Sequence, residues 1–267
     1  MGSAVTKMLV SNNRPKKPTR HRHIVAELTA SPTVRTSDLA RSLGVSTETV
    51  RRDIEELTRQ GLVSRTYGGA ASAHVGLQLE ATAREAYFVE ERKRIARLAV
   101  QLVRPGDVLM VDAGSTNTYF ARALGVTTLD VTVITNGFSV ASALAGQSRV
   151  RVIFCPGDVS EAERGVYGQE TTAFLNRFHA DVAFIGASGV TAEGPTDVET
   201  QACWIKRAML ERAERGVLLA DSSKFQRKHF EIVCAWSQLT DFVTDAELPA
   251  PLARKLSGAA LQTHIAR

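Results

Sequence analysis

Residues Thr36–Ala70 read TSDLARSLGVSTETVRRDIEELTRQGLVSRTYGGA, and this stretch decides the fold of the N-terminal part of the chain. Three apolar residues near its start recur at helical spacing: Leu39, Ala40 and Leu43. The spacing predicts a short helix over 37–43. Gly44 is expected to end this helix, because glycine adopts the left-handed conformation of a helix C-terminus at little cost.

A second helix is predicted to begin directly after this turn. Ser46 is a good N-cap, and Glu48 lies in the first turn, where the helix macrodipole stabilises an anion. Three apolar residues recur at i, i+4 and i+7 and form the buried stripe: Val50, Ile54 and Leu57. The stripe leaves polar side chains on the outer side: Thr47, Arg51, Arg52 and Arg59. Two short helices joined by a glycine-containing turn are typical of a helix-turn-helix.

The outer side of the second helix suits the major groove of DNA, where Arg can donate to guanine and Thr can contact a thymine methyl. The run Leu62–Tyr67, closed by Gly68 and Gly69, predicts a hairpin wing whose Arg65 can reach a phosphate or the minor groove. A generic three-helix unit with a solvated charged face is the alternative. We expect DNA contacts from Thr36, Ser46, Thr47, Thr49, Arg51, Arg52 and Arg65.

At these residues the chain resembles a known family. The segment STETVRRDIEELTRQGLVSRTYGGA is similar to the N-terminal DNA-binding signature of DeoR-type bacterial transcription regulators. Tyr67 departs from that signature, because those proteins often carry His there, and only a local backbone or base contact depends on it. The predicted winged helix-turn-helix spans residues 19–72 and follows a mobile basic arm over 1–18.

Length and charge indicate a second domain. A chain of 267 residues with 44% hydrophobic composition can bury a large core and is too long for a DNA-binding domain alone. Residues 1–75 carry 12 Lys and Arg against 6 Asp and Glu, whereas the remaining residues carry 21 against 22. A basic module joined to a nearly neutral one favours a nucleic-acid-binding domain tethered to a domain that binds a small molecule or a protein.

The cysteines and the apolar segments favour the reducing cytoplasm. Cys155, Cys203 and Cys234 are isolated in apolar surroundings, so they predict neither a disulfide framework nor a Cys-x-x-Cys metal site. No apolar run reaches about 18 residues, and residues 1–17 lack the apolar core of a signal peptide. We expect no membrane partner, no metal and no cofactor, and a linker over 73–87.

Beyond the linker the sequence predicts a mostly parallel α/β domain over 88–267. Five short apolar runs alternate with helical stretches: 108–111, 131–134, 150–154, 182–185 and 217–220. Such runs are typical of strands buried on both faces of a parallel sheet. Two later runs, 232–235 and 242–244, are expected to extend the sheet. The predicted fold class is α/β, with the winged helix-turn-helix preceding the sheet.

Polar and glycine residues follow four of the predicted strands, at 112–117, 135–137, 186–189 and 221–224. Ligands of open α/β sheets bind at the carboxyl ends of the strands, so these four ends predict one polar cleft. The glycine and hydroxyl residues at 114–116 begin a helix, whose backbone N–H groups can hold a phosphate or carboxylate. Plain helix caps and, for Lys224, a surface lysine are the alternatives.

The same strand ends resemble the sensor domain of DeoR-type regulators. The matching motifs are DAGSTN, TN, GASG and DSSKF, with the helix that begins near Glu199. In that family the sensor resembles ribose-5-phosphate isomerase and binds a phosphorylated sugar or related metabolite. The resemblance implies a phosphate held by Gly114, Ser115 and Thr116, and polar contacts from Asp112, Asn136, Gly189, Asp221 and Lys224.

Three further features have plainer interpretations. Thr196–Glu199 match a capping box, so Glu199 is expected to cap the helix that follows. His21 and His23 lie in a basic segment without further ligands, and we expect them at the surface or on a phosphate rather than on a metal. The motif Cys155-Pro156-Gly157-Asp158 stands where many relatives have a Gly-Gly pair, which affects the local loop and the sugar specificity.

The leading hypothesis is a ligand-responsive transcription regulator, and by the family's habit a repressor of a carbohydrate or polyol operon. We expect it to bind a double-stranded operator as a homo-oligomer, a dimer or tetramer, because one short recognition helix gives little affinity. A phosphorylated sugar or polyol would change that affinity. A sugar-phosphate isomerase-like enzyme with a DNA-binding appendage is the main alternative, although no nucleophile flanked by a base is visible. An RNA-binding or architectural DNA protein is a third.

Overall fold

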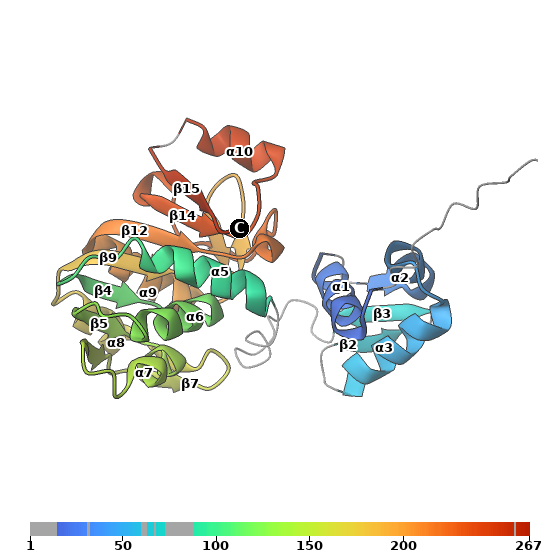
Figure 1. Cartoon of the computed structure of the whole chain (residues 1–267), viewed down its shortest axis with the longest axis horizontal. Coiled ribbons are helices and arrows are strands. Elements are labelled where there is room, and N and C mark those ends of the chain that lie inside the picture. Colours follow the sequence, from blue (N-terminus) through green and yellow to red (C-terminus); the bar gives the residue numbers. More distant parts are fainter. Residues whose placement is uncertain (1–14, 31–32, 60–62, 67, 73–87, 259) are drawn as a thin grey trace, which may run out of the picture. The chain divides into compact units, whose positions relative to one another are not determined.

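The structure is a computed structural model that describes residues 15–30, 33–59, 63–66, 68–72, 88–258 and 260–267. The chain divides into an N-terminal unit, Met1–Leu77, and a C-terminal unit, Gln78–Arg267 (Figure 1). The predicted linker over 73–87, Tyr67 and most of the predicted basic arm lie outside the described residues.

The N-terminal unit contains the predicted helix-turn-helix and wing. Its described elements are α1 (Lys17–Ala30), β1 (Thr33–Arg35), α2 (Thr36–Leu43), α3 (Thr47–Arg59), β2 (Val63–Thr66) and β3 (Gly69–Ser72). The strands form an antiparallel sheet in the order β1-β3-β2. A Cβ at Gly69 would lie 2.2 Å from the carbonyl oxygen of Val34, so only glycine lets the wing approach β1 this closely.

The turn between α2 and α3 has the predicted geometry. Gly44 follows α2 with a left-handed φ of 62°. The Ser46 hydroxyl accepts a hydrogen bond of 3.1 Å from the backbone N–H of Thr49, which is an N-cap bond. The predicted apolar stripes of both helices are buried together with side chains of α1 and the wing: Ile24, Leu28, Leu39, Ala40, Leu43, Val50, Ile54, Leu57, Val63 and Ala70.

A buried carboxylate fixes α3 against α1. Asp53 Oδ2 accepts a hydrogen bond of 2.7 Å from Arg20 Nε, and Asp53 Oδ1 accepts one of 3.0 Å from Arg20 Nη2. His21 Nε2 lies 3.2 Å from the same Oδ1. The His21 side chain is only 12% exposed, so the expectation of a surface or phosphate-contacting residue is wrong for His21. Its ring is used to orient the two helices.

The C-terminal unit alternates strands and helices as predicted. Its first half runs α5 (Val89–Val100), β4 (Val108–Val111), α6 (Ser115–Gly125), β5 (Val131–Thr135), α7 (Phe138–Leu144), β6 (Val150–Phe154), β7 (Asp158–Ser160), β8 (Gly165–Tyr167), α8 (Gln169–Leu175) and β9 (Ala180–Ile185). Its second half runs β10 (Gly189–Val190), β11 (Pro195–Asp197), α9 (Thr200–Glu211), β12 (Ala213–Leu219), the 3-10 turn η1 (Ser222–Lys224), β13 (Glu231–Ile232), η2 (Trp236–Gln238), β14 (Asp241–Thr244), α10 (Ala250–Leu256) and β15 (Gln262–Ile265).

Seven strands form the main sheet, in the order β15-β14-β12-β9-β4-β5-β6, and every neighbouring pair is parallel. The predicted α/β class is therefore confirmed, and the run at 242–244 joins the sheet as β14. The expectation for 232–235 is wrong. Its first residue belongs to β13, which pairs with β11 in a separate antiparallel sheet, while Val233 and Cys234 pack into the core.

Alternate residues of each strand face opposite helical layers. Leu109 and Val111 pack in one cluster with apolar side chains of α5, α6 and α7. Met110, between them, packs in another cluster with α8 and α9. Figure 1 shows α5 and α6 in front of the strands. Both faces are thus covered, which explains why the strands are continuous apolar runs rather than alternating ones.

The strand order places a reversal beside β4. From β4 the chain continues to β5 and β6 on one side, whereas β9, β12, β14 and β15 follow on the other side. The helices after β4 and β9 therefore diverge, and a crevice opens between the carboxyl ends of these two strands.

Candidate functional site

A small polar pocket lies at this reversal. It is lined by the carboxyl ends of β4 and β9, the start of α6, and side chains of the β7–β8 hairpin, β11, α9 and η1: Asp112, Ala113, Gly114, Ser115, Thr116, Glu163, Gly186, Ala187, Ser188, Asp197, Lys206 and Lys224. We name it the switch pocket. The structure brings together here five of the predicted ligand residues: Asp112, Gly114, Ser115, Thr116 and Lys224.

The N-terminus of α6 opens onto the switch pocket. Gly114 occupies the N-cap position with an extended backbone, and no side chain makes a capping hydrogen bond. Ser115 and Thr116 lie inside the first helical turn, so the alternative that they are plain caps does not describe this helix. An uncapped N-terminus keeps backbone N–H groups and the positive end of the helix dipole available to an anion.

A buried cation lies deeper in the pocket. Lys206 Nζ is 3.1 Å from Asp112 Oδ2 and 3.0 Å from Asp197 Oδ2, and none of the three side chains is more than 10% exposed. The backbone N–H of Gly186 donates to Asp112 at 3.1 Å, and the Ser188 hydroxyl donates to Asp197 at 2.6 Å. We name Asp112, Asp197 and Lys206 the Lys206 cluster.

The surroundings of Lys206 and Asp197 favour the charged form of each. Burial by itself lowers the pKa of Lys206, but the charges of Asp112 and Asp197 more than offset it and raise the pKa well above its ordinary value. For Asp197, burial by itself raises the pKa, but the charge of Lys206 and the hydrogen bond from Ser188 more than offset it and bring the pKa below its ordinary value. One cation between two carboxylates leaves a net negative charge, which suits hydroxyl groups better than an anion.

Lys224 supplies the positive charge at the α6 side of the pocket. It ends η1, whose first turn is fixed by Asp221, since the Asp221 carboxylate accepts a 3.1 Å hydrogen bond from the Ser223 N–H. The Lys224 side chain is half-buried and lines the pocket, whereas a surface lysine was the alternative. An anion would therefore lie between Lys224 and the α6 N-terminus.

Three predicted ligand residues do not line the switch pocket. Asn136 is 1% exposed, and its side-chain N–H donates to the carbonyl of Val166 at 3.0 Å, which ties β5 to β8. A Cβ at Gly189 would lie 2.1 Å from the carbonyl oxygen of Arg227, so this glycine permits a close backbone approach. Asp221 is fully buried behind the pocket. None of the three lines the switch pocket in this structure, and direct ligand contact by them stays a prediction.

Sequence reasoning missed Lys206, Asp197 and Glu163 as pocket residues, whereas Ser188 lies in the predicted strand end 186–189. A signal for Lys206 existed, because it follows Ala202 by four residues and precedes Met209 by three, on the buried stripe of α9. The capping-box prediction is wrong. Glu199 occupies the N-cap position of α9 without a side-chain cap, and Asp197 pairs with Lys206 instead.

The Cys155–Asp158 motif leads into the hairpin that carries Glu163. Gly157 has a φ of 149°, and a Cβ there would lie 2.6 Å from the carbonyl oxygen of Tyr167. Glycine is thus required where β7 turns to pair with β8. The effect of this motif on sugar specificity stays a prediction.

The outer side of α3 presents the expected cations. The side chains of Arg51 and Arg52 are 60% and 77% exposed, with Glu48 3.9 and 3.4 Å away. Ser46 and Thr47 are also exposed, and the Thr49 hydroxyl lies 2.8 Å from that of Ser46. Such weak surface pairs leave both Arg side chains available to phosphates or bases.

Thr36 and Arg65 differ from that group. Thr36 is only 7% exposed at the start of α2, and its N–H donates to the carbonyl of Gly68 at 3.0 Å. The structure thus places Thr36 largely buried and bonded to the wing, and its DNA contact stays a prediction. The side chains of Arg59 and Arg65 lie outside the described residues, so their roles stay predictions.

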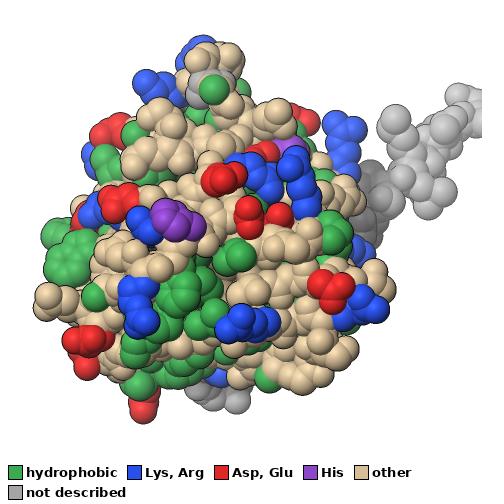
Figure 2. All heavy atoms as spheres, turned by 90° about the vertical axis from the view of Figure 1, so that its left-hand side faces the viewer, with side chains coloured by type: hydrophobic (Ala, Val, Ile, Leu, Met, Phe, Trp, Pro, Cys, Tyr) green, Lys and Arg blue, Asp and Glu red, His purple; other side chains and the backbone are tan. Residues whose placement is uncertain are grey.

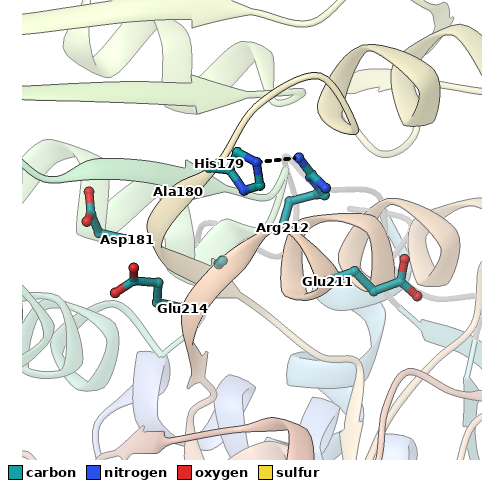
Figure 3. Close-up of a pocket in the computed structure, with 7 residues that line it drawn as sticks. His179, Ala180, Asp181, Glu211, Arg212 and Glu214 are labelled. Atoms are coloured by element: carbon teal, nitrogen blue, oxygen red, sulfur yellow. Dashed lines mark hydrogen bonds between the residues drawn. The ribbon is translucent and has the colours of Figure 1, made fainter.

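A second pocket lies at the opposite edge of the sheet, at the amino ends of β9 and β12 (Figure 3). Its lining residues are His179, Ala180, Asp181, Glu211, Arg212, Ala213 and Glu214. Arg212 is engaged, with one nitrogen 3.1 Å from the His179 ring and another donating to the carbonyl of Phe178 at 2.8 Å. Three carboxylates beside this engaged cation disfavour an anion in this second pocket.

Three further features of the described residues bear on function: the cysteine thiols, the groups of possible metal ligands and the length of the apolar helices. Burial raises the pKa of the Cys155 and Cys234 thiols to about 12 and that of Cys203 to about 11, so all three are poor nucleophiles near neutral pH. No group of three or more His, Cys, Asp and Glu in the described part of the chain is placed to hold a metal ion. Among the helices described, none is long and apolar enough to cross a membrane. Figure 2 shows one face of the C-terminal unit, where acidic and basic side chains are interspersed.

Each of the two units matches a known protein family. Residues 20–75 match the DeoR-like helix-turn-helix domain, and residues 88–246 match the DeoR C terminal sensor domain. The chain is 29% identical to the glycerol-3-phosphate regulon repressor of Escherichia coli K12, over 94% of this chain and 99% of that protein. It is 31% identical to the L-fucose operon activator of Haemophilus influenzae, over 79% and 85% of the two chains.

Among solved structures, ribose 5-phosphate isomerase A from Methanocaldococcus jannaschii overlaps 51% of this chain and 54% of its own, with 25% identity and a TM-score of 0.37. The two family models cover most of the described residues of both units, from within α1 to β14. The chain therefore belongs to the DeoR family of DNA-binding transcription regulators.

Proposed function

We propose that this regulator binds a phosphorylated sugar or polyol in the switch pocket and that the bound ligand sets its affinity for an operator. The observation that carries the proposal is the uncapped N-terminus of α6 beside Lys224. These groups supply backbone donors, a helix dipole and a cation at one point, which together suit a phosphate monoester.

The rest of the pocket suits a hydroxylated carbon chain. Asp112, Asp197 and Glu163 offer acceptors, as does the Ser188 hydroxyl, whose proton goes to Asp197, and Lys206 offers a donor. A ligand with a phosphate at one end and hydroxyls along its length would use both parts of the pocket. A nonphosphorylated sugar would leave the α6 N-terminus without an anion and is expected to bind more weakly.

Relatives favour repression as the outcome of DNA binding. One is named a glycerol-3-phosphate regulon repressor, and another, from Bacillus subtilis, is named the HTH-type transcriptional repressor GlcR. The L-fucose operon activator shows that the sign of regulation varies among relatives. We propose a repressor of a carbohydrate or polyol operon that acts as a homo-oligomer, because two half-sites are needed for tight binding. The ligand lowers DNA affinity if it prefers the weakly binding arrangement.

A thermal-shift screen tests the proposal. The full chain is incubated with sn-glycerol 3-phosphate and with pentose and hexose phosphates, each beside its unphosphorylated parent. A ligand at 100 times its dissociation constant should stabilise the chain by about 2.7 kcal/mol. Lys224→Met should abolish the shift, whereas Lys228→Met, an exposed lysine outside the pocket, should retain it.

The active ligand is then added to the protein bound to a DNA fragment from upstream of its own gene. We expect the protein to bind that fragment more tightly than random duplex, and the ligand to release it. The proposal fails if no phosphate ester shifts the wild type, or if the two lysine variants respond alike. Repeated turnover of a sugar phosphate would support the enzyme alternative instead.

A further inference from the structure

An ion pair between α5 and η1 lies behind the switch pocket. Arg92 Nε donates to Asp221 Oδ2 at 3.0 Å, and the two side chains are only 2% and 0% exposed. Burying two charges costs desolvation energy, and apolar replacements of such pairs often give equal or greater stability. Stability alone is therefore a weak reason for an ion pair at this position.

The Asp221 end of the pair is connected to the switch pocket. Asp221 precedes η1 and caps it through the Ser223 N–H, and Lys224 at the end of η1 lines the pocket. Burial by itself raises the pKa of Asp221, but the charges of Arg92 and Lys224 more than offset it and hold the pKa below its ordinary value. Asp221 is thus a shared counter-ion of Arg92 and Lys224.

The Arg92 end is connected to the helix that follows the linker residues. Arg92 lies in the first turn of α5, which is the first described element after residues 73–87. The same helix packs its apolar side, including Ile95 and Ala99, in one cluster with Phe120 and Leu124 of α6. Helix α5 therefore contacts both elements that would hold the anion, α6 by packing and η1 through the ion pair.

Resting on the proposed function, we propose that the Arg92–Asp221 ion pair is the positioning link through which an anion in the switch pocket acts on α5. An anion next to Lys224 competes with Asp221 for that lysine's charge. Asp221 is then left with Arg92 as its main counter-ion, and the pair tightens. The tighter pair holds the first turn of α5, which the chain enters from the linker.

Hydrogen exchange of the full chain, with and without saturating inorganic phosphate at matched ionic strength, tests this link. Phosphate should slow exchange at residues 112–118, where it binds, and at 89–100, which is α5. Arg92→Met with Asp221→Asn removes both charges and keeps an oxygen to cap Ser223. This double variant should retain the slowing at 112–118 and lose it at 89–100.

Two single variants keep the test decisive if the double variant does not fold. Asp221→Asn alone should also lose the slowing of exchange at 89–100. Arg92→Lys, which keeps a cation at this position, should retain most of that slowing. Arg207→Met with Glu231→Gln is the matched control, because this pair ties α9 to β13 with a 2.7 Å contact and involves neither α5 nor η1. The control should respond like the wild type.

The outcomes separate the two proposals. Equal slowing of α5 in the wild type and the pair variants overturns the link and leaves the ligand site standing. Loss of the α5 response in the Arg207/Glu231 control also overturns it, since the effect would then be unspecific. If phosphate leaves 112–118 of the wild type unchanged, the ligand site itself is refuted, and the link fails with it.

Discussion

The two helices assigned to binding begin in opposite ways. Helix α3 is capped by the Ser46 hydroxyl, which occupies a backbone N–H of its first turn. Helix α6 begins at Gly114 without a side-chain cap. The difference agrees with the proposed modes of binding, in which α3 would offer side chains to its partner and α6 would offer backbone N–H groups. A cap is compatible with the first mode and competes with the second.

The cations of the two sites also differ, in their exposure and in how tightly they are paired. On α3 the Arg side chains are largely exposed and only loosely paired with Glu48. In the switch pocket Lys206 is buried and held by two carboxylates. Substitutions on α3 should therefore change DNA binding with little effect on folding, whereas substitutions in the Lys206 cluster should lower the stability of the C-terminal unit.

Lys206→Met is expected to have the largest effect on stability. It leaves Asp112 and Asp197 buried without their cation, and the loss of one partner of a buried ion pair typically costs about 3–5 kcal/mol. Chemical denaturation followed by the signal of the C-terminal unit measures it. Lys224→Met, which is half-buried, should cost far less. Equal costs would remove the distinction between the two lysines.

Acid should destabilise the C-terminal unit through its buried, ion-paired carboxyl groups. The carboxyls of Asp197 and Asp221 both have a pKa below their ordinary value of 3.8, so each stabilises the fold fully above about pH 4. That contribution is lost as the pH falls through the lowered pKa. Denaturation curves between pH 7 and pH 2, wild type against Asp197→Asn, should show a shallower acid dependence for the variant. Parallel curves would contradict the ionised cluster.

Arg51→Ala should leave folding unchanged and weaken DNA binding. A base contact by Arg is worth about 1–3 kcal/mol, and a phosphate contact would instead flatten the salt dependence. Electrophoretic titration at several salt concentrations, with Arg52→Ala in parallel, distinguishes the two cases. Wild-type binding by both variants at moderate salt would refute the assignment of α3.

Ser46→Ala should have the smallest effect of the four. Loss of an N-cap costs about 1 kcal/mol of helix stability. We expect this loss in the thermal unfolding of the N-terminal unit, while ligand binding in the C-terminal unit is unchanged. A stability equal to that of the wild type would show that the Thr49 N–H is satisfied equally well by water.

The elements with an apolar pattern of their own could be predicted from the sequence. The apolar runs 108–111 and 150–154 and the α3 stripe are examples. The strands β1, β13 and β15 could not, since each holds a single apolar residue and forms through partners that lie far away in the chain. At position 232 an apolar run was visible, but its pairing with β11 was not.

The site was predicted in part for the same reason. Glycine, hydroxyl and carboxyl residues after β4 mark the pocket locally, so 112–116 could be placed. The Lys206 cluster joins β4, β11 and α9, and no local pattern shows which lysine meets which carboxylate. Asn136 and Asp221 have the residue types of ligand-binding groups, and the sequence does not show that Asn136 bonds the backbone of Val166 or that Asp221 pairs with Arg92.

The reversal of strand order has a consequence for biosynthesis. One wall of the switch pocket, 112–116, leaves the ribosome well before the opposite wall, which comes from 186–188, 197, 206 and 224. A nascent chain that ends before α9 holds no complete binding site. If the switch pocket holds the metabolite, the metabolite can assist the folding of this unit only after α9 and η1 have been made.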